Sequence, residues 1–249
     1  MNTHVPESSL ASEAYAYIRE RILRGEIAIG QVISRRKIAA DLGMSFLPVS
    51  EAFLRLEFEG LLESRPRAGT RVRIPTQADV EGHYIVREGL EVQAARLFAE
   101  RATAEARMEV LKLAQRVDAL AALPDTDRFV HLSVHEKLHR RIAECAQCPV
   151  LSDAIEKTCA LSSTWLCSGR AVAGNRPENK HAHLAEILGK GDPAAAAEAM
   201  REHIVASREW AMERLAPYFR LAQQQTQTYS RNANAKLPIA PVAEDARPS

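Results

Sequence analysis

The 249-residue sequence has few aromatic residues, few glycines and few cysteines. Aromatic residues make up 5% of the chain and glycines number 11, a composition that disfavours an all-β fold rich in tight turns. No segment approaches the roughly 18 uninterrupted apolar residues that a membrane span needs, so we expect no membrane partner. The first twelve residues lack the basic and apolar segments of a secretory signal. We therefore expect a cytoplasmic chain whose 4 cysteines are reduced thiols rather than disulfides.

Net charge is also nearly absent, at +1, which at first argues against a nucleic-acid partner. The charge is unevenly distributed, however. Residues 10–75 contain 11 basic and 8 acidic residues, a net charge of +3, whereas the residues from 76 onward contain 22 basic and 23 acidic residues, a net charge of −1. The sequence therefore predicts a basic N-terminal module attached to a nearly neutral body, and nucleic acid remains a candidate partner of the basic module.

Four segments differ in composition and periodicity. Apolar residues make up 46% of the chain, which is enough for packed cores. We expect a disordered N-terminus at 1–9, one domain at 10–75 and a second domain at 76–221. The remaining residues, 222–249, are rich in Gln, Thr, Asn, Ala and Pro and have no apolar periodicity, so we expect a disordered tail.

The first domain begins with a pattern of three helices. Apolar residues at helical spacing predict a helix that ends near Gly25. Ser34 is a suitable N-cap for a second helix, and Gly43 can supply the positive φ that ends it. The buried stripe of a third helix follows, at Val49, Ala52, Phe53 and Leu56.

Two short extended segments, residues 61–64 and 70–74, follow the third helix and flank a turn that contains Pro66 and Gly69. Three helices and a hairpin are the plan of a winged helix-turn-helix, in which the third helix enters the major groove of DNA. Arginines surround the hairpin tip, where they can bind phosphates or reach into the minor groove: Arg65, Arg67, Arg71 and Arg73. A solvated hairpin could also carry them, but together with the three helices they favour DNA binding.

The whole first domain resembles the GntR-type winged helix. The matching segments are residues 18–27, 38–45, 48–57 and 59–62. The resemblance and the basic wing together suggest DNA contacts from the second helix, the third helix and the wing. The candidate residues are Arg35, Arg36, Lys37, Ser45, Phe46, Leu47, Ser50, Arg65, Arg67 and Arg71.

Two positions depart from the pattern of that family. The family commonly has arginine after the serine that begins the third helix and again after Pro-Val, where this sequence has Phe46 and Ser50. Such arginines read guanine, whereas Phe46 or Leu47 could contact a thymine methyl group. One winged helix reads a half-site, so we expect a homodimer on a pseudo-palindromic operator, with a sequence that need not be the usual one of the family.

The second domain shows helical periodicity nearly throughout and no alternating strand pattern. The expected helices lie near residues 80–101, 104–120, 127–146, 150–168, 178–188 and 193–215, and Asp192 and Pro193 mark the start of the last one. The sequence therefore predicts a mostly α protein, with an N-terminal winged helix-turn-helix that contains a small β-hairpin and a C-terminal all-α bundle.

Seven of the 8 histidines lie in the second domain. Three of them are spaced by four, so they share a helix face that could bind a metal ion: His131, His135 and His139. His203 falls on the inward stripe of the last helix, whereas His183 and His181 fall on different faces. A histidine is more often an ordinary core or surface imidazole, so the spacing alone leaves a metal site open.

The second domain resembles the FCD ligand-binding domain, the usual partner of this winged helix in the FadR subfamily. The matching features are residues 87–91, residues 135–139, His181 with Glu186, and residues 200–203. The resemblance implies a divalent metal bound by one aspartate and three histidines. Those positions hold four histidines here: His135, His139, His181 and His203. Four imidazoles favour a later transition ion, zinc first and then nickel, cobalt or copper, over magnesium, calcium or manganese.

The same resemblance implies a small carboxylate or sugar-acid effector. An open coordination position could accept its carboxylate, and Arg87 matches the pocket arginine of the family and could add a bidentate contact. Arg87 could also pair with Glu91, four residues later on the helix. We therefore expect an effector-responsive repressor. The alternatives are an enzyme whose four-histidine centre activates water and a metal sensor in which the ion itself is the effector.

Cys145 and Cys148 form a C-x-x-C motif, which with Cys159 and Cys167 could hold zinc or a redox pair. No other motif supports that interpretation, and the resemblance implies ordinary helix-end residues at these positions.

Overall fold

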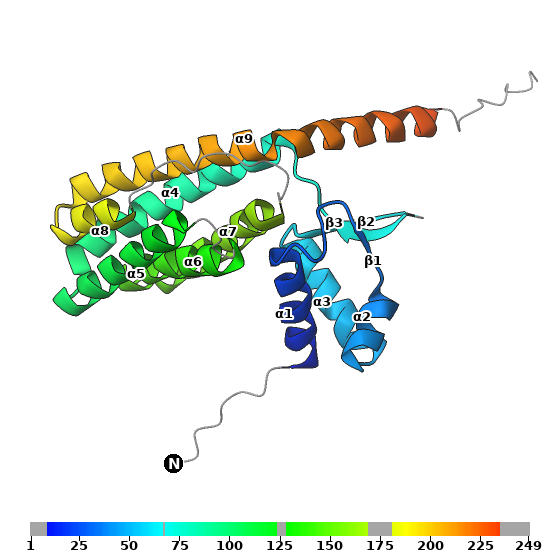
Figure 1. The fold of residues 1–249 in the computed structure, drawn as a ribbon, viewed down its shortest axis with the longest axis horizontal. Coiled ribbons are helices and arrows are strands. Elements are labelled where there is room, and N and C mark those ends of the chain that lie inside the picture. The colour runs from blue at the N-terminus through cyan, green and yellow to red at the C-terminus, as the bar shows by residue number, and fades with distance from the viewer. Residues whose placement is uncertain (1–8, 67, 124–127, 169–180, 235–249) are drawn as a thin grey trace, which may run out of the picture.

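The computed structural model describes residues 9–66, 68–123, 128–168 and 181–234. The N-terminal domain contains α1 (Leu10–Leu23), β1 (Val32–Ile33), α2 (Arg35–Leu42), α3 (Phe46–Phe58), β2 (Leu62–Arg65) and β3 (Gly69–Val72). The C-terminal domain contains α4 (Gln77–Arg101), α5 (Ala104–Ala122), α6 (Arg128–Cys145), α7 (Pro149–Ser168), α8 (His181–Gly189) and α9 (Pro193–Asn234) (Figure 1). The mostly α fold, with a winged helix followed by a helical bundle, is confirmed.

Local capping explains the helix boundaries of the winged helix. The Ser34 hydroxyl accepts a hydrogen bond from the backbone N–H of Lys37, and Gly43 ends α2 with a φ of 62°. Ser45 is the N-cap of α3, although its side chain makes no capping hydrogen bond. The expected stripe of α3 is buried and packs against the buried side chains of α1, which include Ile18 and Ile22.

The wing is a three-stranded antiparallel sheet in the order β1-β3-β2 rather than a two-stranded hairpin. Val32 and Ile33 pair with Arg71 and Thr70, which adds β1 to the sheet. The sequence did not predict β1 because a strand of two residues is too short to show an alternating pattern. The expected turn lies between β2 and β3, where Gly69 has a φ of 79°.

Helices α4 and α9 run side by side along the bundle (Figure 1). Helices α6, α7 and α8 pack against this pair, and α5 packs against α6 and α8. A capping box between Thr76 and Asp79 begins α4. Most of the buried face of α4 is apolar, but it also carries Arg87 and Glu91, which are 3% and 2% exposed. Buried charges of this kind require partners, so we expect a group of polar side chains at the centre of the bundle. None of the described helices has the length and apolar character to cross a membrane.

The expected disordered tail at 222–249 is wrong in its first part, because α9 continues to Asn234. Residues 222–234 include four Gln and two Ala, residue types that favour a helix even without an apolar face. This part of α9 extends past the bundle (Figure 1). Residues 1–8 and 235–249 lie outside the described part of the chain.

The two domains touch where α1 lies against α6 and α7. The guanidinium of Arg19 forms an ion pair with Glu136 at 3.2 Å, and Arg24 lies 4.4 Å from the centre of the Phe129 ring. Because Glu136 follows His135 on α6, the domain contact lies one residue from the candidate metal site.

Candidate functional site

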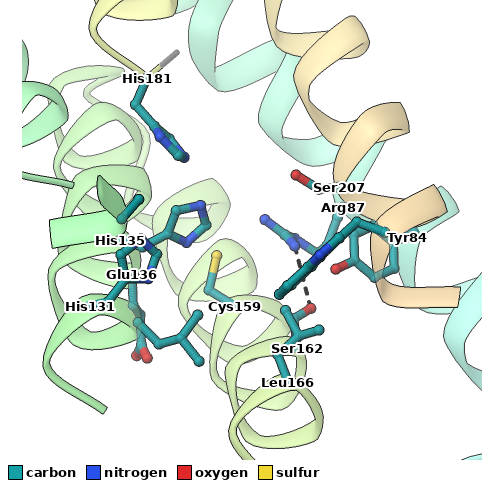
Figure 2. A pocket seen from close by; sticks show the side chains of 13 residues that line it. Tyr84, Arg87, His131, His135, Glu136, Cys159, Ser162, Leu166, His181 and Ser207 are labelled. Carbon is teal, nitrogen blue, oxygen red and sulfur yellow. Dashed lines mark hydrogen bonds between the residues drawn. The ribbon is translucent and has the colours of Figure 1, made fainter. Parts of the chain in front are cut away.

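A cavity with an empty volume of about 690 Å³, its open mouth included, lies within the bundle. Side chains from α4, α6, α7, α8 and α9 converge on it (Figure 2). Its lining includes Tyr84, Arg87, His135, Ser162, His181 and Trp210. Apolar walls with a few convergent polar groups are typical of ligand sites.

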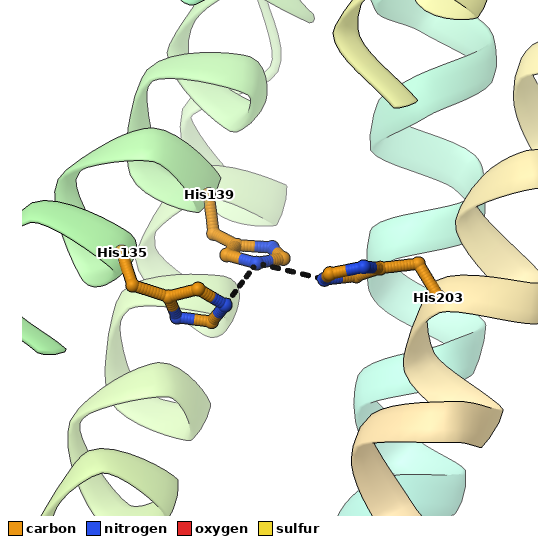
Figure 3. A group of neighbouring side chains, drawn as sticks. All are labelled: His135, His139 and His203. Carbon is orange, nitrogen blue, oxygen red and sulfur yellow. Dashed lines mark hydrogen bonds between the residues drawn. The ribbon is translucent and has the colours of Figure 1, made fainter. Parts of the chain in front are cut away.

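Three histidines meet beside this cavity, two from α6 and one from α9 (Figure 3). The Nε2 atom of His139 lies 3.2 Å from Nε2 of His135 and 3.4 Å from Nε2 of His203. Two imidazole nitrogens bound to one tetrahedral zinc ion lie roughly 3.3 Å apart, since each zinc–nitrogen bond is about 2.0–2.1 Å. Both distances from Nε2 of His139 therefore fit two ligands of one transition metal ion, and the three histidines offer ligand atoms within 4.8 Å of one another.

His181 approaches the same centre from the start of α8. Its ring centre lies 5.0 Å from the ring centres of both His135 and His203. All four histidines of the sequence prediction are thus gathered in space, and His203 points inward as expected.

Two carboxylates orient the histidine rings from behind. Glu91 accepts a hydrogen bond from Nδ1 of His139, and Asp118 accepts one from Nδ1 of His181 at 2.7 Å. A proton held on Nδ1 leaves Nε2 as the basic nitrogen, which is the form that binds a metal. Carboxylate–histidine pairs of this kind are common around metal ions, so the arrangement fits a metal centre.

Electrostatics favour neutral imidazoles at His135 and His203. Burial lowers the pKa of His135 and of His203 well below the ordinary value of 6.5, and the neighbouring imidazoles lower both further. Burial would raise the pKa of Glu91, but Arg87 and His139 outweigh burial and hold it below the ordinary value of 4.5. The site therefore combines neutral nitrogen donors at His135 and His203 with a charged carboxylate at Glu91, and neutral imidazole is the form that binds a metal.

The sequence left two roles open for Arg87, a pairing with Glu91 and a place in the effector cavity, and its side chain is positioned for both. Its Nε atom donates to Oε1 of Glu91 at 2.7 Å, and Nη1 donates to the Ser162 hydroxyl at 3.4 Å (Figure 2). The side chain also lines the cavity. The pairing with Glu91 is thus present, and the guanidinium still faces the space where a ligand carboxylate could lie.

The remaining histidines have other surroundings. His183 is exposed, as expected from its place on the helix. His131 is buried and lines the cavity, with its ring centre 6.2 Å from that of His135. His83 donates from Nε2 to the carbonyl of Thr158 at 2.8 Å, and burial lowers its pKa to about 4.

The cysteines do not form a second metal site in the described part of the chain. Cys145 and Cys159 are buried free thiols, Cys148 is partly exposed, and none of them joins a group of metal-ligating side chains. Burial raises the pKa of Cys159, which disfavours a reactive thiolate. The side chain of Cys167 lies outside the described residues.

Several basic residues of the expected DNA surface have partners within the domain. Arg35 pairs with Glu57 at 2.9 Å and lies over the ring of Phe53. Arg65 and Arg71 both pair with Glu63, at 3.4 and 2.6 Å. Arg67 lies outside the described residues.

The rest of the expected surface is open to solvent. Arg36 and Lys37 are exposed on α2, and Ser45 is exposed before α3. Phe46 and Leu47 are 55% and 68% exposed at the start of α3. Of the described basic residues of the expected surface, Arg36 and Lys37 on α2 are therefore the exposed ones without an ion pair inside the domain.

Sequence reasoning named the four histidines and Arg87, which the structure brings close together, but did not name Asp118, which no sequence motif marks. It also left Tyr84, Ser162 and Trp210 of the cavity unassigned. Glu91 was recognised only as a partner of Arg87. Its contact with His139 joins α4 to α6 across 48 positions of the sequence, so no local pattern shows it.

Comparison with known protein families matches both domains. Residues 10–72 match the family described as bacterial regulatory proteins, gntR family, and residues 83–206 match the FCD domain. A protein of Paenarthrobacter nicotinovorans named "Probable D-xylose utilization operon transcriptional repressor" is 30% identical over 206 residues, which is 80% of this chain and 87% of the relative. The HTH-type transcriptional repressor RspR of Escherichia coli strain K12 is 23% identical over 201 residues, again 80% of this chain and 87% of the relative.

Solved structures share the fold. A GntR transcriptional regulator from Rhodococcus sp. RHA1 aligns with a TM-score of 0.68 at 20% identity, over 82% of this chain and 98% of the other. E. coli McbR/YncC aligns with the same TM-score and identity, over 87% of this chain and 100% of the other.

Proposed function

Because this chain belongs to the gntR family of bacterial regulatory proteins and carries an FCD domain, we propose that it is a transcriptional repressor controlled by a metal-dependent carboxylate effector. The family and its relatives are transcription regulators rather than enzymes. Two relatives are named as repressors, and we extend that role to this chain. A repressor of bacterial genes acts in the cytoplasm, where it meets DNA.

The convergence of three Nε2 atoms beside the cavity is the observation that carries this proposal. His135, His139, His181 and His203 would hold a divalent transition metal, with zinc the first candidate. When bound, the metal supplies a positive charge and a coordination position for an oxygen ligand. Glu91 and Asp118 keep Nε2 of His139 and His181 directed to the centre.

The cavity supplies the remaining contacts of the effector. Arg87 brings a guanidinium that matches a carboxylate, and Ser162 brings a hydroxyl group. The apolar rings of Tyr84 and Trp210 also line the space. These groups favour a small organic or sugar acid over a cation or a wholly apolar ligand.

We propose that the protein acts as a homodimer that meets its partner along α4. The solvent face of α4 carries Ile85 and Val86, which are 62% and 51% exposed, between Gly82 and Gly89. The spacing of 82, 85, 86 and 89 places all four on one helix face. An open apolar stripe flanked by glycines suits close packing of two copies, and a two-fold dimer matches two operator half-sites.

The first test measures metal content and its dependence on the site. Elemental analysis of the purified protein should find about one divalent transition metal per chain, His203→Ala should lose it, and the exposed control His183→Ala should keep it. His203→Ala should still fold and bind DNA. Metal-free wild-type protein with a normal effector response would overturn the site, and so would equal metal content in both variants.

A second test separates an effector-responsive repressor from a metal sensor. Small carboxylates are screened by thermal shift with and without a chelator, and hits are then added to a DNA-binding assay. A hit should raise the melting temperature only in metal-loaded protein and should change DNA affinity. If metal alone changes DNA affinity and no acid alters it, the metal-sensor alternative replaces the proposal.

A further inference from the structure

The exposed start of α3, the helix placed to enter the major groove, has no available cation. Its first two turns present Phe46, Leu47 and Glu51 to solvent, and Ser50 is partly exposed. Guanine offers two hydrogen-bond acceptors in the major groove, which a donor such as arginine reads. Phenylalanine and leucine cannot donate, and the carboxylate of Glu51 can only accept.

Two nearby hydrogen-bonding side chains, those of Arg55 and Ser50, already have partners. Arg55, one turn after Glu51, pairs with Glu59 at 3.1 Å and lies 3.8 Å from the centre of the Tyr15 ring. The hydroxyl of Ser50 donates to the backbone carbonyl of Phe46 at 2.9 Å. Of the described donors here, Ser50 and Arg55 are therefore engaged within the domain, and the hydroxyl of the N-cap residue Ser45 remains open.

The thymine methyl group is the one apolar feature that the four base pairs present in the major groove. We propose that Phe46 and Leu47 read thymine methyl groups and so set the operator sequence of this regulator. The proposal rests on the DNA-binding part of the function and does not depend on the metal or the effector. Arg36 and Lys37, exposed on α2, supply phosphate contacts that position the helix without reading sequence.

DNA is favoured over a protein partner by the position of the two side chains. Phe46 and Leu47 lie in the first turn of α3, where recognition helices contact base edges, and α2, which carries exposed cations, packs against α3. Phe58, which is 93% exposed, lies at the far end of the same helix. It therefore serves as a matched control for exposed apolar character on α3.

The test uses the full chain and a pool of random duplexes, from which bound sequences are selected and a consensus half-site is derived. Each thymine of the consensus is then replaced by deoxyuridine, which removes only the methyl group. At one or two positions in each half-site, the replacement should weaken binding about fourfold, the value of burying one methylene-sized group.

The effect of each deoxyuridine replacement is then measured with the protein variants Phe46→Ala, Leu47→Ala and Phe58→Ala, after circular dichroism confirms that each variant folds. Phe46→Ala or Leu47→Ala should abolish the difference between thymine and deoxyuridine, whereas Phe58→Ala should retain it. The proposal is overturned if no sequence is enriched, if deoxyuridine has no effect at any position, or if the effect persists in both Phe46→Ala and Leu47→Ala. Loss of sequence preference in Phe58→Ala alone would assign the readout to the other end of α3.

Discussion

Glu91→Gln tests whether the buried charge network holds the bundle together. Glu91 is 2% exposed, and both of its oxygens are used, one by Arg87 at 2.7 Å and one by His139. Glutamine has nearly the same size, so the substitution opens no cavity. It removes the negative charge and leaves Arg87, itself 3% exposed, without a compensating charge.

The expected cost is large because the arginine cannot reach water. Removing one partner of a buried ion pair typically destabilises a protein by about 3–5 kcal/mol. In a domain of this size, each kcal/mol lowers the melting temperature by about 2–4 °C, so we expect a fall of roughly 6–20 °C. The control Glu88→Gln lies on the same helix and breaks an exposed pair with Arg201 at 3.5 Å. Exposed pairs contribute about 0–1 kcal/mol, so the control should differ little from wild type.

Thermal unfolding is followed by circular dichroism in the presence of a chelator, so that metal loss does not contribute to the difference. The double variant Arg87→Met with Glu91→Gln removes both charges and should recover much of the lost stability, because no unpaired charge remains. Equal melting temperatures for Glu91→Gln and Glu88→Gln would refute the reasoning. So would a double variant that is less stable than Glu91→Gln alone.

Three further predictions concern the metal, the DNA surface and the dimer. Asp118→Asn should lower metal affinity about 10–100-fold in competition with a coloured chelator, because His181 loses its orienting partner; the exposed control Glu186→Gln should not. Arg36→Ala should weaken DNA binding and reduce the salt slope by about one, whereas Arg35→Ala should mainly lower the melting temperature, since Arg35 is held by Glu57 and Phe53; the opposite pattern would contradict the assignment. Ile85→Glu should convert the dimer to a monomer in sedimentation, and Met108→Glu, a comparably exposed residue on α5, should not; a monomeric wild type or a dimeric Ile85→Glu would exclude α4 as the interface.

The winged helix was predictable because its signals are local. The Ser34 cap, the positive φ of Gly43 and the stripe on α3 each depend on residues a few positions apart, and the structure contains all three. Strand β1 was missed because its two residues gain their structure from pairing with β3, which the local pattern does not contain.

The centre of the bundle was predictable only in part, for the same reason. Helical spacing placed His135 and His139 on one face, and the inward stripe of α9 placed His203. The contact between Asp118 and His181 joins residues 63 positions apart and depends on how α5 and α8 pack. Likewise, the hydrogen bond from Ser50 to Phe46 changes what α3 can offer to a base, and only the folded helix shows it.

Glu91 has only two carboxylate oxygens. One accepts from His139, a candidate metal ligand, and the other accepts from Arg87, the candidate effector contact. In the proposed regulator, a ligand that draws Arg87 away changes how strongly Glu91 holds His139, and metal binding changes how freely Arg87 can meet a carboxylate. Thermodynamic reciprocity then requires that metal raise or lower effector affinity by the same factor that effector raises or lowers metal affinity. Substitutions at Arg87, Glu91 and His139 should therefore be non-additive, and homologues should exchange these three residues together rather than singly.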